Sequence, residues 1–223
     1  MILNNIWLLL NLKNLDKKYD YINDKIKKDL SEYRDFIEEE GSSEKYPWKE
    51  TTYLYDKKGK TLDDILEGYI ASCGDFIEKE SNIKYAKDYI KELIEYYGEN
   101  IQKKEKIQLK NRLFKLLELV RDFALETPAI YDIYSYVIFI FIDNNIIEIP
   151  DLEDIINEKE ANEEDYKVIS SIFEKAYEYY KDEDFKEEVA KFEYVKNNSH
   201  LFKWLYSTEE NNEEEEEKEK NEE

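Results

Sequence analysis

The chain has 223 residues, of which 55 are acidic and 33 basic, and its formal net charge is −22. This charge repels phosphate backbones and anionic lipid, which argues against direct DNA or RNA binding and against a membrane-surface role, and it favours a basic protein partner. One cysteine and one histidine provide no Cys/His zinc cluster, no internal disulfide and few pairs of nucleophile and base. We therefore expect a non-enzymatic protein without a cofactor or a metal.

The two ends of the chain differ from its middle. Residues 1–12 carry no charge, and they lack the preceding basic residues and the small-residue cleavage site of a secretory signal, so a short buried helix is expected there. Residues 208–223 hold ten acidic residues, two lysines and no apolar side chain, which predicts a disordered acidic tail. The most apolar later stretch, Ile133 to Ile142, is ten residues long and too short to span a bilayer. We expect a soluble, cytoplasmic protein, with the nucleus as the alternative compartment.

Helix-forming residues dominate between the 5 glycines and 3 prolines, which predicts an all-α fold. Apolar residues at spacings of three and four predict an amphipathic helix over 15–40 that ends at Gly41. Residues 42–60 contain Pro47, Gly59 and an aromatic run, and we interpret them as an ordered loop at a boundary. The further predicted helices cover 61–73, with a capping box formed by Thr61 and Asp64, and then 81–97, 100–125, 129–143, 151–157, 163–181 and 184–197, with a short turn over 200–206.

The segment 129–143 is apolar on nearly every side, so we expect a helix in the centre of the fold. A buried strand would also fit this pattern, but no partner strands are visible elsewhere in the sequence. Antiparallel helix pairs joined by short loops suggest a HEAT-like array. We expect three parts: N-terminal helices and the aromatic loop in 1–60, a helical domain in 61–207, and the tail in 208–223.

Few residues suit catalysis or metal binding. Cys73 and His200 lie in different segments, and we expect Cys73 to be a plain, partly buried cysteine and His200 to be a helix-terminal or packing residue. The acidic run from Asp151 to Asp154 lacks the central glycine and the distal glutamate of an EF-hand, so we interpret it as solvated charge.

One segment carries more information, the run from Asp122 to Pro128 with the sequence DFALETP. Thr127 followed by Pro128 is a helix start signal, with the threonine as the cap and the proline at the first helical position. Asp122 and Glu126 would then project two carboxylates from a rigid turn between two helices. Glu126 would also lie near the positive end of the following helix.

This pattern of acid, three residues, acid, one residue and proline is followed by an apolar helix and a short turn into Ile146 and Ile147. It resembles the MA-3 domain of initiation factor 4G and programmed cell death protein 4, most clearly over residues 113–147. The resemblance implies that Asp122 and Glu126 contact basic residues of a DEAD-box RNA helicase of the initiation factor 4A type, and that Thr127 and Pro128 fix the corner. The family's glycine in the later turn is replaced here by Asn144 and Asn145.

Two functions in different classes follow. The first is a protein-interaction module of the translation-initiation type, monomeric or part of a larger complex, that binds a DEAD-box helicase or another basic protein surface through Asp122, Glu126, Thr127 and Pro128. The second is an acidic adaptor or chaperone-like protein for basic clients, acting through the tail and the overall charge. An all-α enzyme that uses carboxylates is a third alternative, but no acid pair with metal-ligand spacing is apparent on one helix face.

Overall fold

The computed structural model describes residues 23–57, 61–98, 101, 103–156 and 163–206. All regular structure in these ranges is helical, which confirms the all-α prediction. The segment 129–143, for which a buried strand was the alternative, contains a helix. The predicted helix in 1–12, the start of the predicted helix over 15–40 and the acidic tail lie outside the described residues.

The chain divides into two compact units, Met1–Ile147 and Glu148–Glu223. The segment 23–57, which the sequence placed in a separate N-terminal part, packs within the first unit. The ring of Tyr33, for example, lies 5.5 Å from the ring of Tyr89 in an edge-to-face arrangement. The division predicted at residues 60 and 207 stays a prediction.

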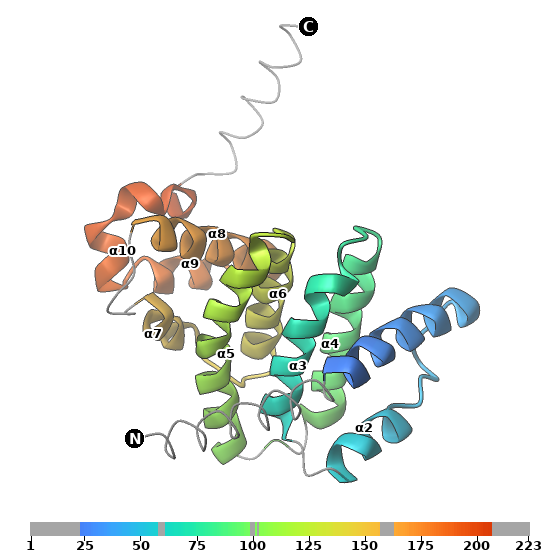
Figure 1. Ribbon diagram of the computed structural model, residues 1–223. Coiled ribbons are helices and arrows are strands. Elements are labelled where there is room, and N and C mark those ends of the chain that lie inside the picture. Colours follow the sequence, from blue (N-terminus) through green and yellow to red (C-terminus); the bar gives the residue numbers. More distant parts are fainter. Residues whose placement is uncertain (1–22, 58–60, 99–100, 102, 157–162, 207–223) are drawn as a thin grey trace, which may run out of the picture. The chain divides into compact units, whose positions relative to one another are not determined.

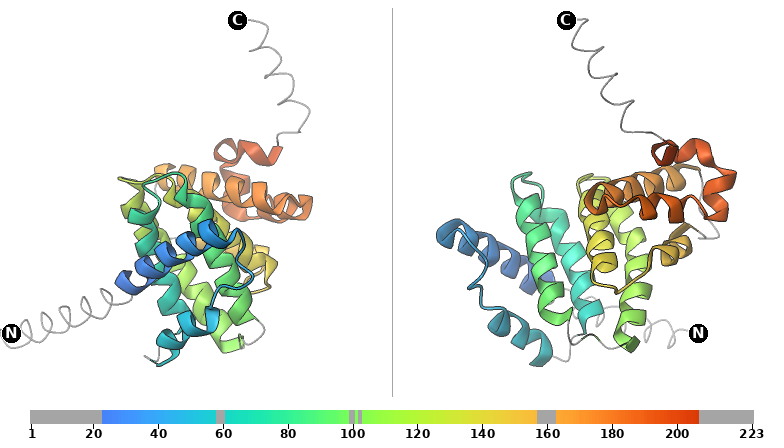
Figure 2. Two further views of the ribbon diagram at one scale, coloured as in Figure 1. Left: turned by 90° about the vertical axis from the view of Figure 1, so that its right-hand side faces the viewer. Right: turned by 180° about the vertical axis from the view of Figure 1, so that it is seen from behind.

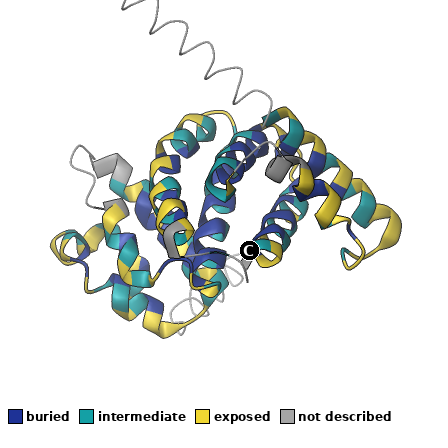
Figure 3. Cartoon of the chain, turned by 90° about the horizontal axis from the view of Figure 1, so that it is seen from below, coloured by how far each residue is buried: buried dark blue, intermediate teal, exposed yellow. Residues whose placement is uncertain are grey.

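Four helices form the centre of the first unit: α3 (Leu62–Phe76), α4 (Asn82–Gly98), α5 (Lys103–Ala124) and α6 (Ile130–Asp143). They lie side by side in Figures 1 and 2, and α3 and α6 each pack against the other three. Most helices carry buried residues along one side and exposed residues along the other (Figure 3). Helix α6 instead buries residues all around, including Ile133, Val137 and Phe141, which confirms its predicted central place.

Two buried tyrosine hydroxyls in this centre donate to backbone carbonyls of neighbouring helices. The Tyr134 hydroxyl of α6 donates to the Leu113 carbonyl of α5 at 2.7 Å. The Tyr69 hydroxyl of α3 donates to the Ala86 carbonyl of α4 at 2.9 Å. Because a buried polar group costs free energy unless it is hydrogen-bonded, these bonds favour one arrangement of the helices.

Helix ends follow the local chemistry of the sequence at two predicted positions. Gly41 closes the helix over 23–40 with a left-handed φ of 73°, and its N–H donates to the Ile37 carbonyl at 2.9 Å. Thr61 precedes α3 in a capping box, in which its N–H donates to Asp64 Oδ2 at 3.4 Å. Both residues act as the sequence predicts.

The segment predicted as a loop over 42–60 contains a helix, α2 (Trp48–Lys57), so that prediction was wrong. Pro47 stands directly before the first turn, and its carbonyl accepts the Thr51 N–H at 3.0 Å. Proline breaks a helix interior, but it is compatible with a helix start. Within the aromatic run, Tyr46 and Trp48 pack against each other with ring centroids 4.8 Å apart, whereas Tyr53 is exposed.

The second unit contains one long helix, α8 (Glu163–Tyr180), among short ones: η1 (Ile149–Leu152), α7 (Glu153–Ile156), α9 (Glu183–Val189), α10 (Glu193–Asn197), η2 (Ser199–Leu201) and η3 (Lys203–Tyr206). The Ser170 hydroxyl of α8 donates to the Leu201 carbonyl at 2.6 Å and accepts the Trp204 indole N–H at 3.2 Å. The prediction of a single helix over 184–197 was wrong, because two short helices, α9 and α10, cover this segment. Phe192 separates α9 from α10 with an extended backbone (φ −59°, ψ 134°) and a buried side chain.

Candidate interaction site at the α5–α6 corner

The predicted contact residues lie where α5 ends and α6 begins, and residues 122–128 are called the α5–α6 corner below. The N–H groups of Glu126 and Thr127 both donate to the Phe123 carbonyl, at 3.1 and 2.8 Å, which closes the last turn of α5. The Ile130 N–H donates to the Thr127 carbonyl at 3.0 Å, which opens α6. Backbone hydrogen bonds therefore hold the corner from both sides.

Thr127 does not cap α6, so that part of the sequence prediction was wrong. Helix α6 begins at Ile130 with Ala129 at its N-cap position, and Pro128 lies in the preceding turn. The Thr127 hydroxyl instead donates to the Gly74 carbonyl of α3 at 3.3 Å. A capping threonine accepts a backbone N–H of its own helix, whereas the Thr127 hydroxyl is used as a donor to a carbonyl near the end of α3. Thr127 still fixes the corner, but it does so by attaching the corner to a neighbouring helix.

A second contact attaches the corner to the same residue of α3. A Cβ atom added to Gly74 would lie 2.8 Å from Cδ1 of Phe123, a distance too short for two carbon atoms. The absence of a side chain at Gly74 therefore lets the Phe123 ring approach the α3 backbone. The ring contact and the Thr127 hydrogen bond flank the segment 124–126 and hold it rigidly on the helix bundle.

The side chains between these two contacts face solvent. Asp122 and Glu126 are exposed, as the sequence predicts, and Pro128 is exposed as well. Leu125 is 87% exposed, the largest value among the exposed large apolar side chains of the described residues. The sequence pattern does not identify Leu125 as a contact residue; its one signal is that Leu125 lies outside the apolar stripe of α5 that includes Leu113, Val120 and Phe123. The corner thus presents an apolar side chain between two carboxylates.

The dipoles of the two helices that meet at the corner act differently on its two acidic side chains. Asp122 lies in the last turn of α5, near the negative end of the helix dipole, where an acidic side chain destabilises the helix. Glu126 precedes α6 and lies closer to the positive end of that helix. Atoms Nε and Nη2 of the neighbouring Arg121 are buried, so this part of its guanidinium is not presented to solvent beside Asp122.

The structure also places the other three residues that the sequence analysis considered, Cys73, His200 and Asp151. Cys73 is fully buried, more deeply than expected, and desolvation raises the pKa of its thiol to about 12. His200 is exposed in η2. Asp151 accepts the Glu148 N–H at 2.9 Å through Oδ2, which makes it a helix-start residue of η1.

Comparisons of this chain with protein-family models, with curated proteins and with solved structures found no match. Within the ranges that the structure describes, no helix is long and apolar enough to cross a membrane.

Proposed function

We propose that this chain is a protein-interaction module that binds a basic protein surface through the α5–α6 corner. The observation that carries the proposal is the exposure of Leu125 between Asp122 and Glu126, on a turn that Phe123 and Thr127 attach to α3. An apolar side chain held rigidly loses little conformational entropy when a partner covers it. The flanking carboxylates would select a partner that offers lysine or arginine around an apolar pocket.

The resemblance to the MA-3 domain suggests which partner to test first. It implies a HEAT-like arrangement of the helices and a DEAD-box RNA helicase of the initiation factor 4A type as the basic surface. The net charge of −22 supports a basic partner because it would accelerate encounter at low salt. Binding should weaken as salt rises, since exposed charge pairs are screened over roughly 8 to 10 Å at physiological ionic strength.

The test is a binding titration of the purified chain against such a helicase, with both charges of the corner reversed (Asp122→Lys with Glu126→Lys). We expect affinity to fall at least about tenfold, because like charges across an interface cost several kcal/mol. The matched control reverses two exposed acids outside α5 and α6 (Glu40→Lys with Glu80→Lys), which changes the net charge equally. Unchanged affinity of the corner variant contradicts the proposed site, and an equal loss in the control shows that overall charge alone drives binding.

The run of acids in 208–223 favours a second candidate, an acidic adaptor or chaperone-like protein for basic clients. Deleting these residues separates the two functions. Loss of binding to basic clients on deletion, with no greater effect of the corner variant Asp122→Lys with Glu126→Lys than of its control Glu40→Lys with Glu80→Lys, supports the adaptor. Binding that survives deletion and is lost on corner reversal supports the interaction module.

A further inference from the structure

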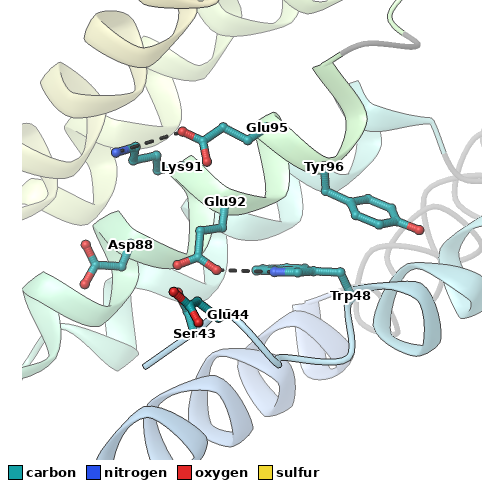
Figure 4. Close-up of a pocket in the computed structure, with 8 residues that line it drawn as sticks. All are labelled: Ser43, Glu44, Trp48, Asp88, Lys91, Glu92, Glu95 and Tyr96. Carbon is teal, nitrogen blue, oxygen red and sulfur yellow. Dashed lines mark hydrogen bonds and ion pairs between the residues drawn. The ribbon is translucent and has the colours of Figure 1, made fainter. Parts of the chain in front are cut away.

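A second surface of the first unit combines acids with aromatic rings. A groove of about 440 Å³ lies between the start of α2, the preceding loop and one face of α4 (Figure 4). Four carboxylates and two aromatic rings account for most of its lining: Glu44, Asp88, Glu92, Glu95, Trp48 and Tyr96. Ser43 and Lys91 complete it. This groove does not include any residue of the α5–α6 corner.

One wall of the groove is held in place by hydrogen bonds to Glu92. Its Oε1 accepts the Tyr33 hydroxyl at 2.8 Å, and its Oε2 accepts the Trp48 indole N–H at 3.3 Å. The Trp48 ring also packs 5.2 Å from Tyr89 and 4.8 Å from Tyr46, measured between ring centroids. Trp48 is therefore fixed before any ligand arrives, and binding need not spend free energy on ordering it.

The remaining carboxylates are available to a cation. Lys91 lies 3.9 Å from Glu95, but both side chains are about half exposed, and such a pair contributes little free energy. Desolvation, the largest cause, raises the pKa of Asp88; the nearby charge of Glu92 also raises it, whereas Lys84, Lys91 and Lys87 lower it. The lining itself has four carboxylates against one lysine, so an added positive charge would reduce the repulsion between the carboxylates.

The shape of the groove favours an extended organic cation over a metal ion. Among the residues that the structure describes, no three His, Cys, Asp or Glu side chains converge closely enough to hold a metal. The volume of about 440 Å³ also far exceeds that of one ion. A guanidinium is planar, donates two parallel hydrogen bonds to a carboxylate and stacks on aromatic faces, whereas an ammonium is a compact and strongly hydrated point charge.

We propose that this groove binds an arginine side chain of a partner polypeptide, between the carboxylates of α4 and the rings of Trp48 and Tyr96. The site would give the chain a second contact with a basic partner. It stands independently of the α5–α6 corner, because no residue is shared between them.

The test is an NMR titration of the intact chain at low ionic strength with the peptide Gly-Gly-Arg-Gly-Gly, blocked at both ends. The readout is the indole N–H signal of Trp48, which is assigned among the three tryptophans by its loss in Trp48→Phe. We expect a saturable shift of this signal. The matched peptide with citrulline in place of arginine keeps the shape without the charge, and it should bind at least about tenfold more weakly because the charge-assisted hydrogen bonds and the cation–π contact are lost.

Two variants make the assignment specific. Asp88→Asn with Glu95→Gln should weaken arginine-peptide binding at least about fivefold through loss of carboxylate partners, whereas Glu78→Gln with Glu80→Gln, which neutralises two exposed acids outside the groove, should leave it unchanged. Reversal of Asp122 and Glu126 should also leave it unchanged, so failure of one site is distinguishable from failure of the other. Equal binding of the citrulline peptide, or equal affinity in the Asp88/Glu95 variant, overturns the proposal. A lysine peptide that binds more tightly than the arginine peptide overturns the choice of arginine.

Discussion

The ring of Phe123 occupies the space where a side chain of Gly74 would be, and an added Cβ would approach its Cδ1 to 2.8 Å. This contact joins the end of α5 to the end of α3. The carbonyl of the same glycine accepts the Thr127 hydroxyl at 3.3 Å. One residue of α3 therefore determines the position of the segment that carries Asp122, Leu125 and Glu126.

Gly74→Ala should destabilise the protein, although alanine usually favours a helix over glycine by roughly 0.5 to 1 kcal/mol. The new methyl group must displace the Phe123 ring, and such overpacking costs about 1 to 3 kcal/mol. We expect a net decrease in the free energy of unfolding, measured by urea denaturation, and weaker binding of the corner to its partner.

The Phe123 ring is the proposed cause, so removing it should reduce the effect. In the Phe123→Ala background, Gly74→Ala should lower the free energy of unfolding by less than it does in the unmodified chain. A double-mutant cycle measures the difference. Additive effects of the two substitutions would show that the Gly74–Phe123 contact does not position the corner.

Reversing the charge of Asp122 alone should separate stability from binding. A lysine in the last turn of α5 interacts favourably with the helix dipole, which is worth about 0.3 to 1 kcal/mol, so Asp122→Lys should raise the melting temperature slightly. The same substitution should weaken binding to a basic partner. Glu126→Lys should weaken binding without the rise, because Glu126 precedes the positive end of α6.

Thermal unfolding by circular dichroism and the binding titration measure both quantities on the same samples. An Asp122→Lys variant that is more stable and still binds with full affinity contradicts a role of this carboxylate in recognition. A variant that loses both stability and binding would instead indicate that Asp122 supports the fold.

The sequence predicts the helix ends that depend on local chemistry, such as Gly41 with its left-handed backbone and Thr61 with its capping box. It also predicts the central helix α6, because the apolar residues on every side of this helix are evident from the segment's own sequence. The contacts that build the two sites join distant residues, 53 positions apart for Thr127 and Gly74 and 59 for Tyr33 and Glu92. No periodic pattern encodes such pairs, since they depend on how helices pack.

Glu92 connects three segments of the first unit, and its removal should be costly. Glu92→Ala leaves the buried Tyr33 hydroxyl and the Trp48 indole N–H without the acceptor they share, and an unsatisfied buried donor costs about 1 to 3 kcal/mol. We expect a lower urea midpoint and a changed tryptophan emission. Glu95→Ala on the same face of α4 serves as the control, and its exposed side chain should have little effect on stability. Equal midpoints for the two variants would show that the Glu92 hydrogen bonds contribute nothing measurable.

Stability should fall at alkaline pH because several buried acids hold their protons in the folded state. Desolvation raises the pKa of Tyr46, Tyr136 and Cys73 to about 12. In the unfolded chain tyrosine loses its proton near pH 10 and cysteine near 8.5, so between roughly pH 9 and pH 12 the unfolded state binds fewer protons and is favoured by rising pH. The stabilisation that these protonated groups contribute is complete below this window and is lost as the pH rises through it.

Urea midpoints at about pH 8, 10 and 11 should therefore decrease in that order, with tyrosinate absorbance rising as the protein unfolds. Tyr46→Phe removes one of these groups and should make the decline shallower, whereas a midpoint that is constant from about pH 8 to 11 would show that these side chains are not protected from solvent.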